Sequence, residues 1–385
     1  MKKYEKILTS LFCGVLLIGG VATMSCSIKT IGKATLESLK TGWNSGSNIE
    51  SSLAEGFFGK EKIIDLYGLV ERVLGRTYIR DVNPSNVVLK DNHDQLQFIS
   101  FKTDNTKSIE HITSLNEVLK EKGIPLLYVQ TPLKIIEDFT ELPESVLDYS
   151  KENTDTFLEE LDKANVDYLD LRENMIEDNL DLETLFYKTD HHWTTQTAFW
   201  AVDQVVDELA ERYGMVLDVG NVYTNLDNYN LTTYPDFFLG SQGRRVGRLY
   251  AGVDDYTLIT PKFDTNYEVT INKSDSSRTS EGSFEEAILK QDLLDETKSV
   301  YTNRYASYFG ADYPEVIVKN KNQEGHKVLI IKDSFALPFS AFLSTMCEET
   351  RMLDLRYYDV ENLEAYIEDY NPDLVLFVYK SIKTE

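Results

Sequence analysis

The chain has 385 residues, of which 42% are hydrophobic and 11% aromatic, so it is long and apolar enough to bury a large folded core. Its formal net charge is −25, from 64 acidic against 39 basic residues. So acidic a surface repels a phosphate backbone, and the composition therefore excludes nucleic acid as an expected partner.

The first 26 residues predict an export signal or a membrane anchor. Three lysines among the first six residues precede Ile7 to Met24, an uncharged and largely apolar run. A run of 18 residues is just long enough to span a bilayer and longer than the apolar part of most cleaved signals, which favours an uncleaved anchor. Cys26 follows a small residue and leaves open cleavage with lipidation. We therefore expect the rest of the chain on the extracytoplasmic face of a bacterial cell membrane, tethered, or secreted or lipidated if the signal is cleaved.

Residues 27–54 are rich in Ser, Gly, Lys and Thr and predict a tether, and residues 55–385 predict one folded domain. Within that domain, five apolar strand patterns alternate with helical ones, and these strands are 124–130, 166–171, 327–331, 352–355 and 373–378. The clearest helix is 195–213, with Thr194 as its N-cap and Gly214 as its stop. This alternation predicts an α/β fold with a mainly parallel five-stranded sheet flanked by helices.

The segment from about 221 to 304 interrupts this rhythm. It is rich in Asp, Asn, Thr, Ser, Gly and Tyr, with short strand-like runs such as 267–271. We therefore expect an insertion of strands and loops there.

Two loops carry side chains suited to acyl transfer. Ligands of open α/β sheets bind beyond the carboxyl ends of the strands, where one predicted loop holds Asp190, His191 and His192 and another holds Ser334. Imidazole can take a serine proton near neutral pH, and a carboxylate two residues away in an extended loop lies on the same side and can orient it. His191 would then point the other way. Backbone N–H groups at the turn around Ser334 could bind an oxyanion, so the pattern predicts a triad of Ser334, His192 and Asp190.

Each of these residues also has an alternative interpretation that does not involve acyl transfer. Ser334 could cap the helix that starts near Ala336. Asp190, His191 and His192 could bind a divalent metal, but the three other histidines show no ligand spacing, so we predict neither a metal nor a cofactor. Cys347 follows an apolar run and is expected to be a buried small residue and not a nucleophile.

The two loop sequences, Tyr187-Lys-Thr-Asp-His-His-Trp193 and Lys332-Asp-Ser-Phe335, resemble those of the bacterial DHHW proteins. These proteins belong to the SGNH hydrolase-like group, together with the alginate O-acetylation proteins. Segments 129–134, 240–245 and 353–358 also look like this family. The resemblance implies a flavodoxin-like SGNH domain in which the Asp-x-His element precedes the serine.

By residue, the resemblance implies the same triad, and it adds Arg356, Gly240 and Ser241 as weaker candidates for oxyanion or substrate contacts. It implies a membrane-bound O-acyltransferase as acetyl donor and a polysaccharide as acceptor. The expected function is extracytoplasmic O-acetylation of a cell-surface or secreted polysaccharide through an acetyl-serine intermediate. A carbohydrate acetylesterase with the same triad, and a non-catalytic polysaccharide-binding or assembly protein, remain as alternatives.

Overall fold

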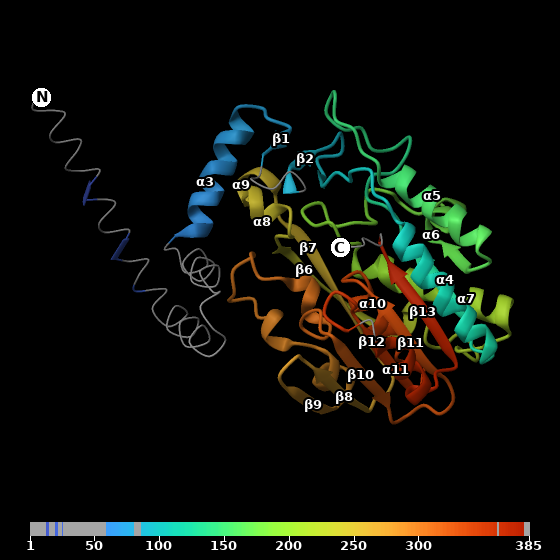
Figure 1. Cartoon of the computed structure of the whole chain (residues 1–385). Helices are drawn as coiled ribbons and strands as arrows, with labels where there is room; N and C mark the ends of the chain where they lie inside the picture. The colour runs from blue at the N-terminus through green and yellow to red at the C-terminus, as the bar shows by residue number, and fades with distance from the viewer. Residues whose placement is uncertain are drawn as a thin grey trace, which may run out of the picture.

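The computed structural model describes residues 59–80, 86–359 and 362–380, together with five isolated residues near the N-terminus (Cys13, Gly14, Gly20, Val21 and Ser25) (Figure 1). The predicted anchor and tether lie almost wholly outside the described residues. Within the described part of the chain, no helix combines the length and the apolar character needed to cross a membrane.

The core of the fold is one eight-stranded sheet with the order β5-β4-β13-β11-β12-β10-β8-β9. Its strands are β4 (Leu126–Gln130), β5 (Asp167–Asp170), β8 (Tyr267–Asn272), β9 (Ser277–Gly282), β10 (Glu315–Asn320), β11 (Lys327–Lys332), β12 (Glu349–Leu353) and β13 (Leu374–Tyr379). The first five strands in this order pair in parallel, and the last three join antiparallel. The parallel strands point their carboxyl ends to one edge of the sheet, where the predicted loop with Ser334 begins directly after β11. The predicted loop with Asp190 and His192 does not follow β5 directly, because the unpredicted helix α6 (Leu171–Glu177) lies between them.

The five predicted strands all form, but the prediction of a mainly parallel five-stranded sheet is wrong about the whole sheet, which is mixed. Strands β8 and β9 come from the predicted insertion, and β10 was not predicted at all. Strand β8 alternates buried and half-buried residues along its length, which suits an antiparallel extension with one well-covered face. The insertion therefore adds two strands to the edge of the sheet, in addition to its loops.

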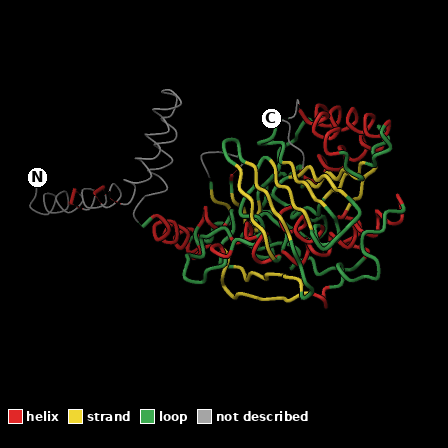
Figure 2. Tube along the Cα trace, turned by 90° about the horizontal axis from the view of Figure 1, so that it is seen from below, coloured by secondary structure: helices red, strands yellow, loops and turns green. Residues whose placement is uncertain are grey.

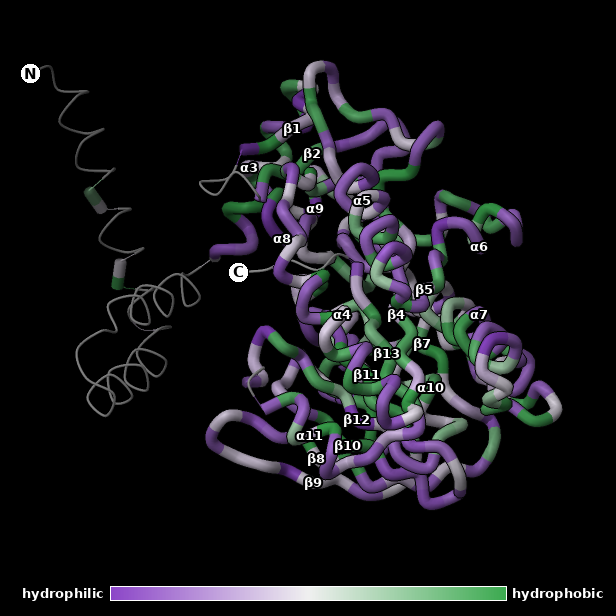
Figure 3. Tube along the Cα trace, turned by 45° about the vertical axis from the view of Figure 1, so that its right-hand side comes forward, coloured by the Kyte–Doolittle hydropathy of each residue, from purple (hydrophilic) through white to green (hydrophobic). Residues whose placement is uncertain are grey.

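Helices cover both faces of the sheet, so the fold has three layers (Figures 1 and 2). Alternate residues of β13 contribute to two separate hydrophobic clusters. The helices of one cluster are α4 (Thr106–Glu121), α5 (Ser150–Lys163) and α11 (Leu363–Tyr370), and those of the other are α6 (Leu171–Glu177), α7 (Thr195–Tyr213) and α10 (Ala336–Leu343). The apolar residues of the central strands form the hydrophobic interior seen in Figure 3.

Helix α7 matches its predicted limits. The Thr194 hydroxyl accepts a hydrogen bond from the Thr197 N–H, and Gly214 ends the helix with a φ of 66°. This left-handed conformation is one that glycine adopts without strain.

A smaller group of elements packs beside the sheet near the start of the described chain. It consists of α3 (Lys60–Val73), the three-stranded sheet of β1 (Tyr78–Ile79), β2 (Val88–Lys90) and β3 (Leu96–Gln97), and the short helices α8 (Gly243–Val246) and α9 (Arg248–Ala251). A hairpin of β6 (Tyr229–Phe238) and β7 (Asp254–Pro261) forms a separate two-stranded sheet. Short helical turns are η2 (Leu226–Asn228), η3 (Phe284–Ile288), η4 (Gln291–Leu293) and η5 (Arg304–Ser307).

Candidate active site

Ser334 lies in the tight turn between β11 and α10, at the carboxyl edge of the sheet. Its Oγ is 2.7 Å from His192 Nε2. The N-cap of α10 is Phe335, and no side chain caps that helix. The serine hydroxyl therefore faces the imidazole and does not serve as a helix cap.

His192 links Ser334 to Asp190 through the two nitrogens of its ring. Its Nδ1 lies 2.5 Å from Asp190 Oδ1, and its backbone N–H donates to the same oxygen. The Tyr305 ring stacks on the imidazole at 3.9 Å and 11°. The structure thus brings the three predicted residues into one hydrogen-bonded chain with a fixed imidazole plane, while their catalytic role stays a prediction.

Asp190 is almost fully buried, and its second oxygen accepts the Ser241 N–H at 2.5 Å. Burial raises the pKa of Asp190, but His192, His191 and the hydrogen bonds from His192 and Ser241 together hold it well below its usual value. The carboxylate therefore stays ionised at neutral pH.

His191 does not point away, so that prediction is wrong. Its ring lies 3.8 Å from the His192 ring, and its Nδ1 is 2.7 Å from Ser241 Oγ. Burial, followed by the charge of His192, lowers the pKa of His191 well below its usual value. The loop does not stay extended here, because residues 188–192 form a turn and a bend and His191 turns toward Ser241.

Asp190, His191 and His192 offer ligand atoms within 4.8 Å of one another, so among the described residues they form a group that could hold a metal ion. However, both nitrogens of His192 and both oxygens of Asp190 already have hydrogen-bond partners in the triad and its support. A metal would have to replace these bonds. The donor set therefore fits a proton-transfer chain better than a metal centre.

Gly240 and Ser241 contact Asp190 and hold its carboxylate in place. Gly240 donates its N–H to Thr189 Oγ1 at 2.8 Å. A Cβ at position 240 would lie 2.2 Å from the Cβ of Asp190, so only glycine fits this close approach. The structure thus gives both residues a role in holding the carboxylate, which the sequence had not assigned.

We expect Gly240→Ala to lower kcat/KM of the predicted acyl-transfer reaction by about tenfold or more, because the new methyl group must displace Asp190 from His192. Ser241→Ala is the control, since it keeps the backbone N–H that Asp190 accepts and removes only the hydroxyl next to His191. Initial-rate kinetics of the two variants would show the difference. A similar loss in both would contradict the role given to the close approach.

Arg356 lies just beyond β12 and is anchored by acidic residues. Its Nε is 2.8 Å from Asp354 Oδ1, and its Nη2 is 3.0 Å from Asp312 Oδ2. Asp312 also pairs at 2.5 Å with Lys332, the buried last residue of β11. This network places a half-exposed guanidinium near the carboxyl edge of the sheet, and its contact with substrate or oxyanion stays a prediction.

The turn around Ser334 offers one unused backbone donor. The Phe335 N–H donates to Asp333 Oδ1 at 2.9 Å, whereas the Ser334 N–H has no hydrogen-bond partner among the described residues. A free amide on the nucleophile itself is well placed to bind the oxygen of a tetrahedral intermediate. Burial raises the pKa of Asp333, with hydrogen bonds from the Lys380 and Phe335 amides opposing the shift.

Sequence reasoning assigned no role to Lys134, Asp254 or Tyr305. Asp254 accepts the backbone N–H groups of Lys188 at 2.7 Å and Thr189 at 2.9 Å, so it fixes the start of the His192 loop. Tyr305 stacks on His192, and its hydroxyl donates to the Phe335 carbonyl at 2.8 Å. Of the three, only Lys134 lay in a segment that resembled the family, residues 129–134, and no signal there pointed to its role.

Lys134 is buried and ties together the loops around the triad. Its Nζ donates to the carbonyl oxygens of Leu96, Tyr187 and Asp190 at 2.7, 2.8 and 2.7 Å. Burial lowers the pKa of Lys134 to about 7, and the charges of Asp254 and Asp190 oppose this shift. The ammonium group thus takes the place of the backbone hydrogen bonds that these irregular segments lack.

We expect Lys134→Met to lower the free energy of unfolding by about 3 kcal/mol, because several buried carbonyl groups lose their donor at once. Urea unfolding monitored by circular dichroism measures this change. The exposed Lys163→Met is the control, since its ion pair with Glu160 is at the surface and contributes little. An equal effect of the two variants would contradict the structural role of Lys134.

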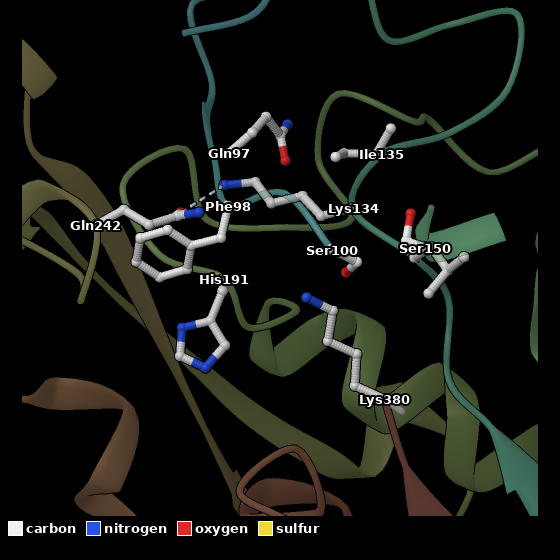
Figure 4. A pocket seen from close by; sticks show the side chains of 10 residues that line it. Gln97, Phe98, Ser100, Lys134, Ile135, Ser150, His191, Gln242 and Lys380 are labelled. Atoms are coloured by element: carbon white, nitrogen blue, oxygen red, sulfur yellow. Dashed lines mark hydrogen bonds between the residues drawn. The ribbon is translucent and has the colours of Figure 1, made fainter. Parts of the chain in front are cut away.

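A small pocket lies beside His191 and is lined by polar and basic groups (Figure 4). Lys134 and Gln242 form one side, joined by a 3.3 Å hydrogen bond from Lys134 Nζ to Gln242 Oε1, and Lys380 points in from the opposite side. None of the described residues that line it is acidic. It adjoins the triad through His191.

Cys347 is fully buried, and burial raises the pKa of its thiol to about 12. A thiol in this state is a poor nucleophile. The interpretation of Cys347 as a core residue is therefore confirmed.

Comparison with known proteins shows what the chain is similar to. Residues 95–224 match the family model of an SGNH hydrolase-like domain described as acetyltransferase AlgX. The structure of Bacillus cereus PatB1 with a sulfonyl adduct has a TM-score of 0.62 and 25% identity, and the match covers 78% of this chain and 95% of that one. A second PatB1 structure has a TM-score of 0.60, 26% identity and coverage of 76% and 95%.

A DHHW family protein from Eubacterium siraeum has the same fold, with a TM-score of 0.58, 18% identity and coverage of 79% of this chain and 92% of that one. No curated protein matches the sequence. The SGNH hydrolase-like and DHHW resemblance predicted from the two loop motifs is confirmed.

Proposed function

We propose that this chain, which carries an SGNH hydrolase-like domain of the acetyltransferase type over residues 95–224, is an O-acetyltransferase that acts on a polysaccharide through Ser334. The observation that carries the proposal is the continuous chain of hydrogen bonds from Ser334 Oγ through His192 to Asp190. The matched family supports acetyl as the group that is moved.

In the first half of the reaction, His192 Nε2 takes the proton of Ser334 Oγ as this oxygen attacks the acetyl carbonyl of the donor. Asp190 stabilises the imidazolium that forms and stays ionised. The oxyanion of the tetrahedral intermediate accepts a hydrogen bond from the Ser334 N–H. The leaving group then takes the proton from His192, which leaves acetyl on Ser334.

In the second half, neutral His192 removes the proton from an acceptor hydroxyl, whose oxygen attacks the acetyl-serine carbonyl. Collapse of the second tetrahedral intermediate breaks the bond to Ser334 Oγ, and His192 returns its proton to the serine. The product is an O-acetylated sugar, and the enzyme regains its starting state. If water takes the place of the sugar, the same steps give an esterase.

The apolar N-terminal run and the family resemblance support a proposal for the setting of this reaction. We propose that the enzyme works on the extracytoplasmic face of the membrane, tethered by its first residues, and receives acetyl groups from a membrane-bound O-acyltransferase. The sulfonyl adduct in the Bacillus cereus PatB1 structure also supports a practical probe, because sulfonyl electrophiles modify activated nucleophiles.

Partition of the acetyl group between sugar and water tests the proposal. The full chain would be supplied with p-nitrophenyl acetate and oligosaccharides, and acetylated sugar and free acetate would be measured together. We expect acetylated sugar to form at the expense of acetate as the acceptor concentration rises. Acetate alone at every acceptor concentration would instead show an esterase, and absence of turnover and of sulfonyl labelling at Ser334 would indicate a binding or assembly protein.

A further inference from the structure

Helix α3 buries polar residues and exposes apolar ones, which is the reverse of an ordinary surface helix. The residues that it buries are Asp65, Gly68 and Glu71. Its large apolar side chains are exposed, and these are Ile63, Leu66, Tyr67, Leu69, Val70 and Val73, followed by Leu74 just beyond its end. A helix normally turns its apolar side to the core and its charges to water. The exposed side of α3 therefore lacks the partner that its composition requires.

Specific contacts hold α3 in this orientation. Asp65 accepts from both the backbone N–H and the Nε of Arg248 at 2.9 Å, and from the Tyr301 hydroxyl at 2.8 Å. A Cβ at Gly68 would lie 2.0 Å from the Val246 carbonyl oxygen, so α8 approaches the helix at this glycine. Rotation of α3 to bury its apolar side would break these contacts and leave Asp65 unpaired.

The exposure is large enough to matter. Leu66 is 61% exposed and Val73 is 77% exposed, and the other exposed apolar side chains of α3 are between 39% and 55%, while Ile64 is half-buried. A contiguous row of this kind marks a surface that binds another apolar phase, whereas single exposed leucines need no explanation. Removing this apolar surface from water would stabilise the bound state by about 25 cal/mol per Å².

The charges around this row are opposite to those of the protein as a whole. Lys60, Lys62, Arg72 and Arg76 are exposed on or next to α3, and Glu61 is the one exposed acidic residue within the helix. The chain carries a net charge of −25, so this basic border is local. Apolar side chains bordered by Lys and Arg, with a tyrosine among them, are the composition of a helix that lies in the headgroup region of an anionic membrane.

The position of α3 agrees with such a role. It lies at the edge of the molecule in both views, at the start of the continuously described chain (Figures 1 and 2). The sequence before it contains the apolar run from Ile7 to Met24. A bilayer that holds this run is within reach of α3.

We propose that α3 is a membrane-surface helix, which gives the enzyme a second attachment to the bilayer and fixes its orientation there. Helix α3 packs on α8 and α9, and α8 begins at Gly243, two residues after the Ser241 N–H that holds Asp190. The membrane would therefore lie on the side of the molecule where the Gly240–Ser241 segment, just before α8, contacts Asp190. This arrangement keeps the triad close to an acetyl donor embedded in the same membrane, but membrane contact by α3 does not depend on acetyl transfer.

Nitroxide labelling of the full chain in vesicles tests this proposal. Cys13→Ser and Cys26→Ser leave the buried Cys347, and Leu66→Cys then provides one reactive position on α3. Leu147→Cys is the matched control, because Leu147 is also an exposed leucine, at 70%, but lies in the loop before α5. The vesicles contain phosphatidylglycerol and phosphatidylcholine, or phosphatidylcholine alone.

For each label we would measure the ratio of its accessibility to oxygen, which concentrates in lipid, to its accessibility to a water-soluble nickel complex. In anionic vesicles we expect this ratio to be at least threefold higher for the label at position 66 than for the label at position 147. The difference should shrink in neutral vesicles, because the basic border loses its partner. Equal accessibility at the two positions would overturn the proposal. It would also be overturned if the Leu66 label were shielded from both reagents without vesicles, since a segment of protein would then cover α3.

Discussion

Ser334→Ala is expected to reduce kcat/KM for acetyl transfer by about 10³-fold or more, because the variant lacks the oxygen that carries the acetyl group. Residual activity would come from binding and from the oxyanion donor alone. Initial rates with p-nitrophenyl acetate and an oligosaccharide acceptor measure the loss. The same variant should lose labelling by a sulfonyl fluoride.

Ser340→Ala is a matched control for this experiment. Ser340 lies on α10, six residues further along, is fully buried, and its Oγ has no hydrogen-bond partner in the described part of the chain. Its loss should leave both folding and kinetics nearly unchanged. Activity that survives Ser334→Ala with the fold intact would contradict the assignment of the nucleophile.

The second large effect is expected from Asp190→Asn, which should lower kcat by about 10³- to 10⁴-fold. An amide cannot stabilise the imidazolium, and its NH₂ group would favour the wrong tautomer of His192 at the 2.5 Å contact with Nδ1. The pH profile of kcat would be informative, since the loss should persist at every pH at which the fold is intact. This behaviour would separate a proton-transfer role from simple destabilisation.

Asp65→Asn serves as the control for loss of a buried carboxylate. Asp65 is 5% exposed and pairs with Arg248, the first residue of α9, and not with any residue of the triad, so its replacement should cost stability without a comparable loss of kcat. Thermal unfolding of both variants would be recorded alongside kinetics. A kcat for Asp190→Asn within tenfold of wild type would contradict the triad.

Local sequence patterns were sufficient to predict the elements that carry the triad. The strands β4, β11 and β13 contain continuous apolar runs, and α7 has both its cap and its glycine stop within the chain that forms it. The adjacency of Asp190 and His192 is also local, so their hydrogen bond could be expected from spacing. The meeting of His192 with Ser334, which is 142 residues away, followed only from the rule that both loops leave the same edge of a parallel sheet.

The supports of the triad could not be predicted, because they depend on contacts between distant segments. Lys134 donates to carbonyl groups 38 to 56 residues away, and no sequence pattern around it predicts these hydrogen bonds. Gly240 is needed because of how closely Asp190 approaches it, which is a property of the folded chain. Strand β10 is short and polar at its ends, and it becomes a strand by pairing between β8 and β12.

Acid-quenched intact-mass measurement of the full chain during turnover of p-nitrophenyl acetate tests the central claim most directly, with peptide mapping to locate the modification. We predict one acetyl group on the peptide that contains Ser334, formed in the wild-type protein, lost on addition of acceptor, and absent from Ser334→Ala and His192→Ala. Acetyl groups on another residue that transfer to acceptor, or undiminished transfer by Ser334→Ala with no adduct, would contradict it.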